Sequence, residues 1–134
     1  MKTKLIIALI VIVTSAKAQN TASFITGPHG GLLKSVENYK IETINSFGCI
    51  TAYLFEGNLT VSPNKFVSGS IMFFYNNDAS LNNYLIPIGT DGFTADVSNK
   101  DYYYYTIHFK VNGKLISTRF ENLYGIAEKE FKKN

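Results

Sequence analysis

The chain of 134 residues contains one cysteine, no tryptophan, two histidines and three prolines. A single cysteine excludes an intrachain disulfide, so the hydrophobic core has to stabilise the fold without a covalent cross-link. Cys49 precedes an apolar stretch. We interpret it as a small buried hydrophobe, with a thiol ligand or an intermolecular disulfide as the alternatives.

Recognisable catalytic motifs are also missing. The side chains with near-neutral titration or strong nucleophilicity are His29, His108 and Cys49, and no known local spacing links them. The chain contains no GxSxG, HExxH or phosphate-loop pattern, and no calcium-loop spacing surrounds its aspartates. We therefore predict that the protein is not an enzyme.

No apolar run is long enough to span a bilayer, which takes about 20 residues. The longest run, Leu5–Val13, follows Lys2 and Lys4 and precedes the small-residue site Ala16-Lys17-Ala18. This order is typical of a secretory signal peptide, residues 1–18, with a membrane anchor as the alternative. We therefore expect an exported protein, periplasmic or secreted, with no transmembrane segment in the mature chain.

The excess of basic residues does not belong to the mature domain. Lys2, Lys4 and Lys17 are three of the 13 Lys and Arg residues, which leaves ten basic side chains against ten acidic ones. A net charge of zero favours neither nucleic acid nor an anionic membrane as a partner.

The clearest structural pattern is a pair of alternating runs on either side of Asn112 and Gly113. Asn and Gly tolerate positive φ at both central positions of a two-residue connection, which predicts a type I′ hairpin. Counting outward from this turn predicts four facing pairs: Val111 with Lys114, Phe109 with Ile116, Ile107 with Thr118, and Tyr105 with Phe120.

Short alternating segments separated by turn residues recur along the mature chain, without a convincing long helix. This pattern predicts an all-β domain over residues 32–122, built as an immunoglobulin-like antiparallel sandwich of seven or eight strands. A small closed β-barrel is the alternative. Residues 19–31 are interpreted as an N-terminal tail and PHGG loop, and residues 123–134 as a C-terminal tail. Pro87 predicts an edge position for the strand that contains it.

His29 lies in this loop, between a proline and two glycines. One interpretation is a tight turn in which the imidazole bonds to a backbone carbonyl. The other is a solvent-accessible copper or zinc ligand, because neutral imidazole binds both metals well. A metal site would need further ligands, and the candidates are Cys49, His108, Met72 or a carboxylate.

The polar face of the hairpin is a candidate interaction face, predicted to expose Tyr102, Tyr104, Thr106 and Arg119. Aromatic and Arg side chains are enriched where proteins bind partners. This face therefore predicts a contact with protein or glycan. Separately, Asn58-Leu59-Thr60 matches a glycosylation acceptor.

Five segments carry a family resemblance: GPHGG, NYKIE, AYLF, GTDGF and FKVNGKLISTRFEN, which begin at residues 27, 38, 52, 89 and 109. Together they resemble small exported β-sandwich proteins of Bacteroidota-type bacteria, and a domain found with heavy-metal efflux adaptors. The positions that match the second pattern are His29, Gly30, Gly31, Tyr39 and Glu42.

The resemblance implies an accessory binding module of copper or zinc handling, whose partner is an efflux component or another envelope protein. The chain lacks the His- or Met-rich stretch expected of a strong copper carrier. The alternative is a metal-free module that binds protein or glycan in the periplasm or outside the cell.

Overall fold

The computed structural model describes residues 25–46 and 48–122, so the predicted signal peptide, residues 19–24 and the predicted C-terminal tail lie outside it. The described part contains ten strands and one short 3-10 turn, and none of its helical segments is long and apolar enough to cross a bilayer. The elements are β1 (Ile25–Thr26), β2 (Leu32–Val36), β3 (Tyr39–Ser46), β4 (Cys49–Glu56), β5 (Thr60–Val61), η1 (Asn64–Phe66), β6 (Val67–Tyr75), β7 (Ser80–Ile88), β8 (Gly92–Asp96), β9 (Tyr102–Val111) and β10 (Lys114–Glu121).

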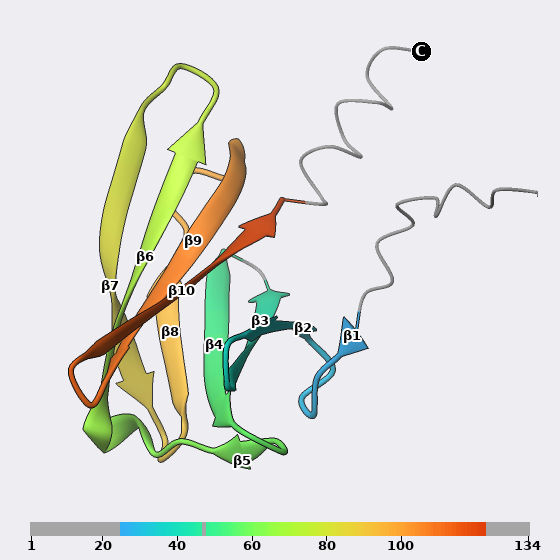
Figure 1. Ribbon diagram of the computed structural model, residues 1–134. Coiled ribbons are helices and arrows are strands. Elements are labelled where there is room, and N and C mark those ends of the chain that lie inside the picture. The colour runs from blue at the N-terminus through green and yellow to red at the C-terminus, as the bar shows by residue number, and fades with distance from the viewer. Residues whose placement is uncertain (1–24, 47, 123–134) are drawn as a thin grey trace, which may run out of the picture.

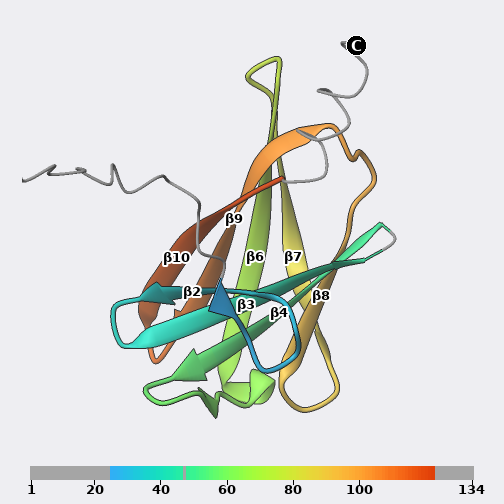
Figure 2. The ribbon, with the colours of Figure 1, turned by 90° about the vertical axis from the view of Figure 1, so that its right-hand side faces the viewer.

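The strands form one continuous antiparallel sheet (Figure 1). Hydrogen-bonded neighbours follow the order β1-β2-β3-β4-β8-β7-β6-β9-β10, and β5 pairs with β4. The sheet curls into a half-barrel (Figure 2). The prediction of an all-β antiparallel fold is confirmed. The immunoglobulin-like sandwich is not confirmed, because the ladder continues unbroken from one half of the sheet to the other.

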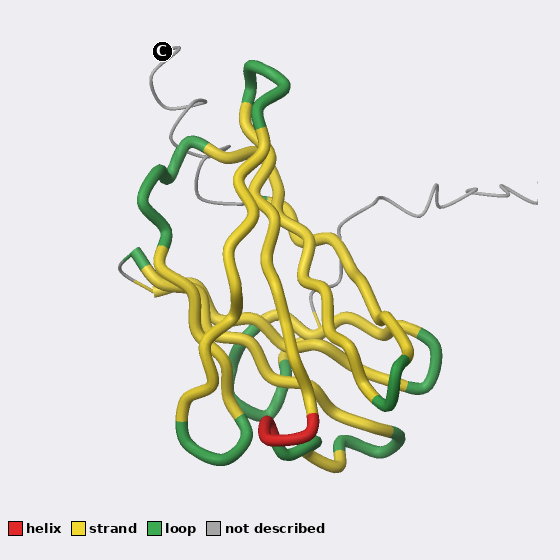
Figure 3. Tube along the Cα trace, turned by 90° about the vertical axis from the view of Figure 1, so that its left-hand side faces the viewer, coloured by secondary structure: helices red, strands yellow, loops and turns green. Residues whose placement is uncertain are grey.

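The two halves of the sheet are joined by β7, which changes partner midway. Its residues 80–85 pair with β6, whereas residues 86–88 pair with β8. Pro87 lies in the second part and faces Phe93. β7 therefore lies inside the sheet, with β6 along one side and β8 along the other. The prediction that the strand containing Pro87 lies at an edge of the sheet is wrong for the strand as a whole. Figure 3 shows how strands dominate the trace, with η1 as a short red turn at one end.

The hairpin prediction is confirmed in detail. Asn112 and Gly113 have φ of 50° and 79°, the positive values that a type I′ connection requires. The ladder pairs β9 with β10 in the predicted register, including Phe109 with Ile116 and Tyr105 with Phe120.

The core lies on the concave side of the curled sheet. Large side chains from both halves are fully buried there, among them Ile41, Ile50, Leu54, Ile71, Phe73, Phe93, Ile107, Phe109 and Phe120. Phe93 of β8 and Phe109 of β9 are not ladder neighbours, yet their ring centroids are 5.1 Å apart. The curl therefore supplies the covering that a flat sheet would lack.

One bulge changes the direction of the side chains in β9. Phe74 faces Tyr104 while Tyr75 faces Tyr102, so Tyr103 is an extra residue on the β9 side. Because of this extra residue, side chains two positions apart across the bulge point to opposite faces of the sheet and not to the same face. The prediction that Tyr102 is exposed is wrong for this reason: Tyr102 points into the core and is 4% exposed.

Candidate functional site

The segment between β1 and β2 folds back over the convex side of β3. Its turn is closed by two backbone hydrogen bonds, from Gly27 N–H to Gly31 O at 2.9 Å and from Gly30 N–H to Gly27 O at 3.0 Å. A Cβ added at Gly27 would lie 2.4 Å from the Glu42 side chain, and one at Gly31 would lie 2.4 Å from Thr43 O. The glycines therefore let this loop approach β3 more closely than other residues would.

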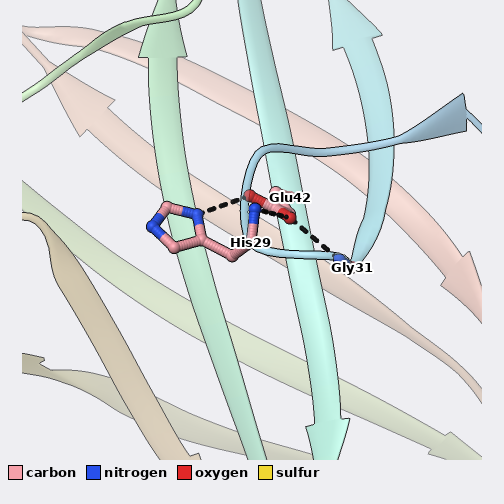
Figure 4. Close-up of polar contacts among 3 residues, drawn as sticks. All are labelled: His29, Gly31 and Glu42. Atoms are coloured by element: carbon pink, nitrogen blue, oxygen red, sulfur yellow. Dashed lines mark hydrogen bonds and ion pairs between the residues drawn. The ribbon is translucent and has the colours of Figure 1, made fainter.

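Glu42 holds the loop in place (Figure 4). Its Oε1 accepts hydrogen bonds from the backbone N–H of His29 at 2.8 Å and of Gly31 at 2.9 Å. Its Oε2 lies 2.8 Å from His29 Nδ1. The Glu42 side chain has no exposed surface. A buried carboxylate is stable only where hydrogen bonds compensate for its lost hydration, and this loop supplies them.

The His29 imidazole lies flat on the ring of Tyr53, with ring centroids 3.7 Å apart and planes 6° from parallel. Its side chain is 33% exposed. Burial, with smaller contributions from the carboxylates of Asp91 and Glu42, raises the pKa of the Tyr53 phenol. Because Nδ1 is bonded to Glu42, Nε2 is the nitrogen that His29 can offer to a ligand.

The other predicted metal ligands lie elsewhere. Cys49 Sγ is 2.7 Å from Thr94 Oγ1, and His108 Nδ1 is 2.6 Å from Ser117 Oγ. Within residues 25–46 and 48–122, no three His, Cys, Asp or Glu side chains are grouped so that they could hold a metal ion. The structure therefore does not bring His29, Cys49 and His108 into one ligand set.

The predicted interaction face is partly present on the convex side of β6, β9 and β10. The Tyr104 ring stacks on Phe74, with centroids 4.5 Å apart and planes at 19°. Arg119 Cζ lies 3.7 Å from the centroid of the same ring, and Arg119 Nε donates to Glu121 Oε1 at 2.7 Å. Thr106 is the ladder partner of Arg119 and lies beside this stack.

We call Phe74, Tyr104 and Arg119 the outer stack. Because β9 lies between β6 and β10, Phe74 and Arg119 flank the Tyr104 ring from its two sides. Phe74 and Tyr104 are partly exposed and Arg119 is exposed. The hairpin register identifies Arg119 and Tyr104 as residues of one face, but Phe74 comes from another strand, whose pairing no local pattern specifies.

Two further residues of the loop site were not predicted as functional. Tyr53 lies on the strand AYLF and Glu42 on the segment NYKIE, both of which belong to the family resemblance. Alternation along β3 puts Glu42 on the face away from Ile41. Its burial depends on a loop that covers this face, and nothing in the alternation of β3 signals that cover.

Comparison with known proteins identifies no relative of this chain. No family model matches the chain, and neither a curated protein nor a solved structure matches it.

Proposed function

We propose that the protein is an exported, non-enzymatic binding module that contacts a protein partner through the convex face of β6, β9 and β10. The observation that carries this proposal is the outer stack. Tyr, Phe and Arg are enriched at the cores of protein interfaces, and Tyr and Arg are among the residues that most often carry the binding energy. Here the ladder and the mutual stacking hold them in place before binding, so little side-chain entropy remains to be lost.

The arrangement of the rings favours protein over glycan. A sugar binds an aromatic side chain by lying on its open face, but the Tyr104 ring is flanked by Phe74 and Arg119. What the outer stack offers is a ridge in which the edge of the Tyr104 ring lies between the Phe74 ring and the Arg119 guanidinium group. Such a ridge suits a complementary pocket that contains an acidic group.

Site-specific photo-crosslinking in the source cells tests this proposal. A photoreactive phenylalanine analogue at Phe74 should crosslink one partner reproducibly, while the same analogue at Asp96, exposed on β8, should not. Tyr104→Ala should weaken the affinity for that partner at least about tenfold, as expected when an anchor residue is truncated. Equal crosslinking from both positions, or unchanged affinity, would argue against the outer stack as the contact.

A second candidate function, weak copper or zinc binding, is favoured by one observation at the loop site. Histidine ligands commonly donate their second ring N–H to a carboxylate, which orients the ring toward the metal. His29 has this arrangement, with Nδ1 at 2.8 Å from Glu42 Oε2 and the ring one-third exposed. This candidate agrees with the resemblance to a domain of heavy-metal efflux adaptors.

Calorimetric titration of the mature protein with copper(I), copper(II) and zinc tests the metal candidate. His29→Ala should weaken binding at least about tenfold, or 1.4 kcal/mol, whereas the matched control His108→Ala should leave it unchanged. Binding through neutral imidazole should also be weaker at pH 5.5 than at pH 7.5. Binding that is unaffected by His29→Ala would remove His29 as a ligand.

A further inference from the structure

The first and last strands of the sheet come together around a groove of about 260 Å³. One wall is a row of three ladder partners, Thr26 of β1, Leu32 of β2 and Thr43 of β3. The other wall includes Tyr105 of β9 and Glu121, the last residue of β10. Several of these residues end or begin their strands, so the groove lies at a mouth of the half-barrel. The mouths of β-barrels are among the usual places where small molecules bind.

Two of the lining side chains are joined by a hydrogen bond across the half-barrel. The Tyr105 hydroxyl donates to Thr43 Oγ1 at 2.9 Å, and both residues are 3% exposed. Because the Thr43 oxygen accepts this bond, its own O–H group remains available as a donor. This O–H has no acceptor among the residues that the structure describes. A ligand with an acceptor in the groove would satisfy this buried hydroxyl.

The remaining polar side chains of the groove supply acceptors as well as donors. Asn45, which also lines it, donates from Nδ2 to the Tyr102 hydroxyl at 2.9 Å, so Asn45 Oδ1 is left to accept. Glu121 Oε1 accepts from Arg119 Nε at 2.7 Å, which leaves Glu121 Oε2. The Thr26 hydroxyl can both donate and accept. A ligand therefore meets both kinds of hydrogen-bonding group here.

The charge of the groove favours a neutral ligand. Among the described residues that line it, Glu121 alone carries a charge, and this carboxylate repels anions. A cation gains little from it, because Glu121 is partly exposed and already pairs with Arg119. Leu32 adds apolar surface between the two threonines of its row. An uncharged molecule with several hydroxyl groups and some C–H surface matches this set of groups, and a sugar is such a molecule.

We propose that the groove binds one neutral sugar residue, either a free monosaccharide or the end of a glycan. The sugar hydroxyls accept from Thr43 and donate to Asn45 Oδ1 and Glu121 Oε2, while a C–H face of the ring packs on Leu32. A volume of about 260 Å³ lies just below the range of about 300–1,000 Å³ that holds drug-sized molecules, which limits the ligand to about one sugar residue. The residues of the outer stack do not line the groove, so this site is independent of the protein contact proposed above.

Saturation-transfer NMR on the purified mature protein tests this proposal, with glucose, galactose, mannose and N-acetylglucosamine as the probes. At least one of these sugars should bind in the millimolar range, as ligand efficiency sets for so small a molecule. The matching uronate should bind at least about threefold more weakly, the size expected for a partly exposed charge pair, and Glu121→Gln should remove this difference. A methyl glycoside that binds as well as the free sugar identifies the end of a glycan as the ligand, whereas a weaker methyl glycoside identifies the free monosaccharide.

A matched pair of variants locates the binding. Thr26 and Thr60 are both exposed and lie on two-residue strands, β1 and β5, so valine at either position should leave the fold intact. Thr26→Val should weaken sugar binding at least about threefold through the loss of one hydrogen bond, whereas Thr60→Val should leave it unchanged. The proposal is overturned if none of the probes binds, if both valine variants have the same effect, or if the uronate binds the unmodified protein as tightly as the neutral sugar.

Discussion

Removing the Glu42 carboxylate should release the loop between β1 and β2. Glu42→Ala leaves three donors without their acceptor: the N–H groups of His29 and Gly31, and His29 Nδ1. Hydrogen bonds to a charged group contribute about 1.5–3 kcal/mol each, which suggests a gross value of about 5–9 kcal/mol for the three. Burying the carboxylate costs several kcal/mol and offsets part of this value. We therefore expect Glu42→Ala to lower the free energy of unfolding by about 2–4 kcal/mol.

Glu42→Gln is the matched variant. Its amide oxygen can still accept both backbone N–H groups, and its NH2 group can donate to His29 Nδ1 if the imidazole changes tautomer. The expected loss is therefore smaller, about 1–2 kcal/mol. Urea unfolding measures both free energies, and amide hydrogen exchange at Gly31 should be accelerated more by Ala than by Gln. A loss below about 0.5 kcal/mol for Glu42→Ala would refute the role of Glu42 as the anchor of the loop.

Three further predictions concern the hairpin and the buried phenols. Gly113→Val should cost more than about 1 kcal/mol in thermal or urea unfolding, because a β-branched residue resists the φ of 79° found there. Phe109→Ala should cost about 3–5 kcal/mol while Lys110→Ala stays within about 0.5, since only Phe109 is buried. Burial raises the pKa of the Tyr105 phenol above its ordinary value of 10.0, so the folded state favours the protonated form. The contribution of Tyr105 to the free energy of unfolding should therefore be constant below about pH 10 and should fall as the pH rises further. Alkaline titration monitored by phenolate absorbance would show this.

The hairpin was predictable because its information is local. Asn112 and Gly113 specify the turn, the turn specifies which residues face each other, and period-two alternation then assigns the faces of β9 and β10. The count of strands was less accurate because β1 and β5 have two residues each, too few for any periodicity. The continuous path of the sheet was not predictable, because β7 changes from β6 to β8 within an unbroken extended segment.

The loop site illustrates a second limit of local patterns. Alternation along β3 correctly separates Glu42 from Ile41, and an outward carboxylate on a strand normally lies in water. Here the Gly-rich segment covers that face, so an outward residue is fully buried. The proline and glycines around His29 indicate a tight turn, but the group that its imidazole contacts is the carboxylate of Glu42 and not a backbone carbonyl. Glu42 is thirteen residues away in the chain and could not be named from spacing.

The bulge at Tyr103 connects the fold to the proposed interaction face. Without the extra residue, Tyr102 and Tyr104 would share one face of β9, as strict alternation predicts. The bulge instead sends Tyr102 inward, where its hydroxyl accepts a hydrogen bond from Asn45 Nδ2 at 2.9 Å, and leaves Tyr104 outward against Phe74 and Arg119. The same strand therefore supplies a tyrosine that ties β9 to β3 and a tyrosine that builds the outer stack. Because these two roles are separated by the single bulge residue Tyr103, its deletion should disturb both the core and the outer stack, whereas Tyr104→Ala should affect the outer stack alone.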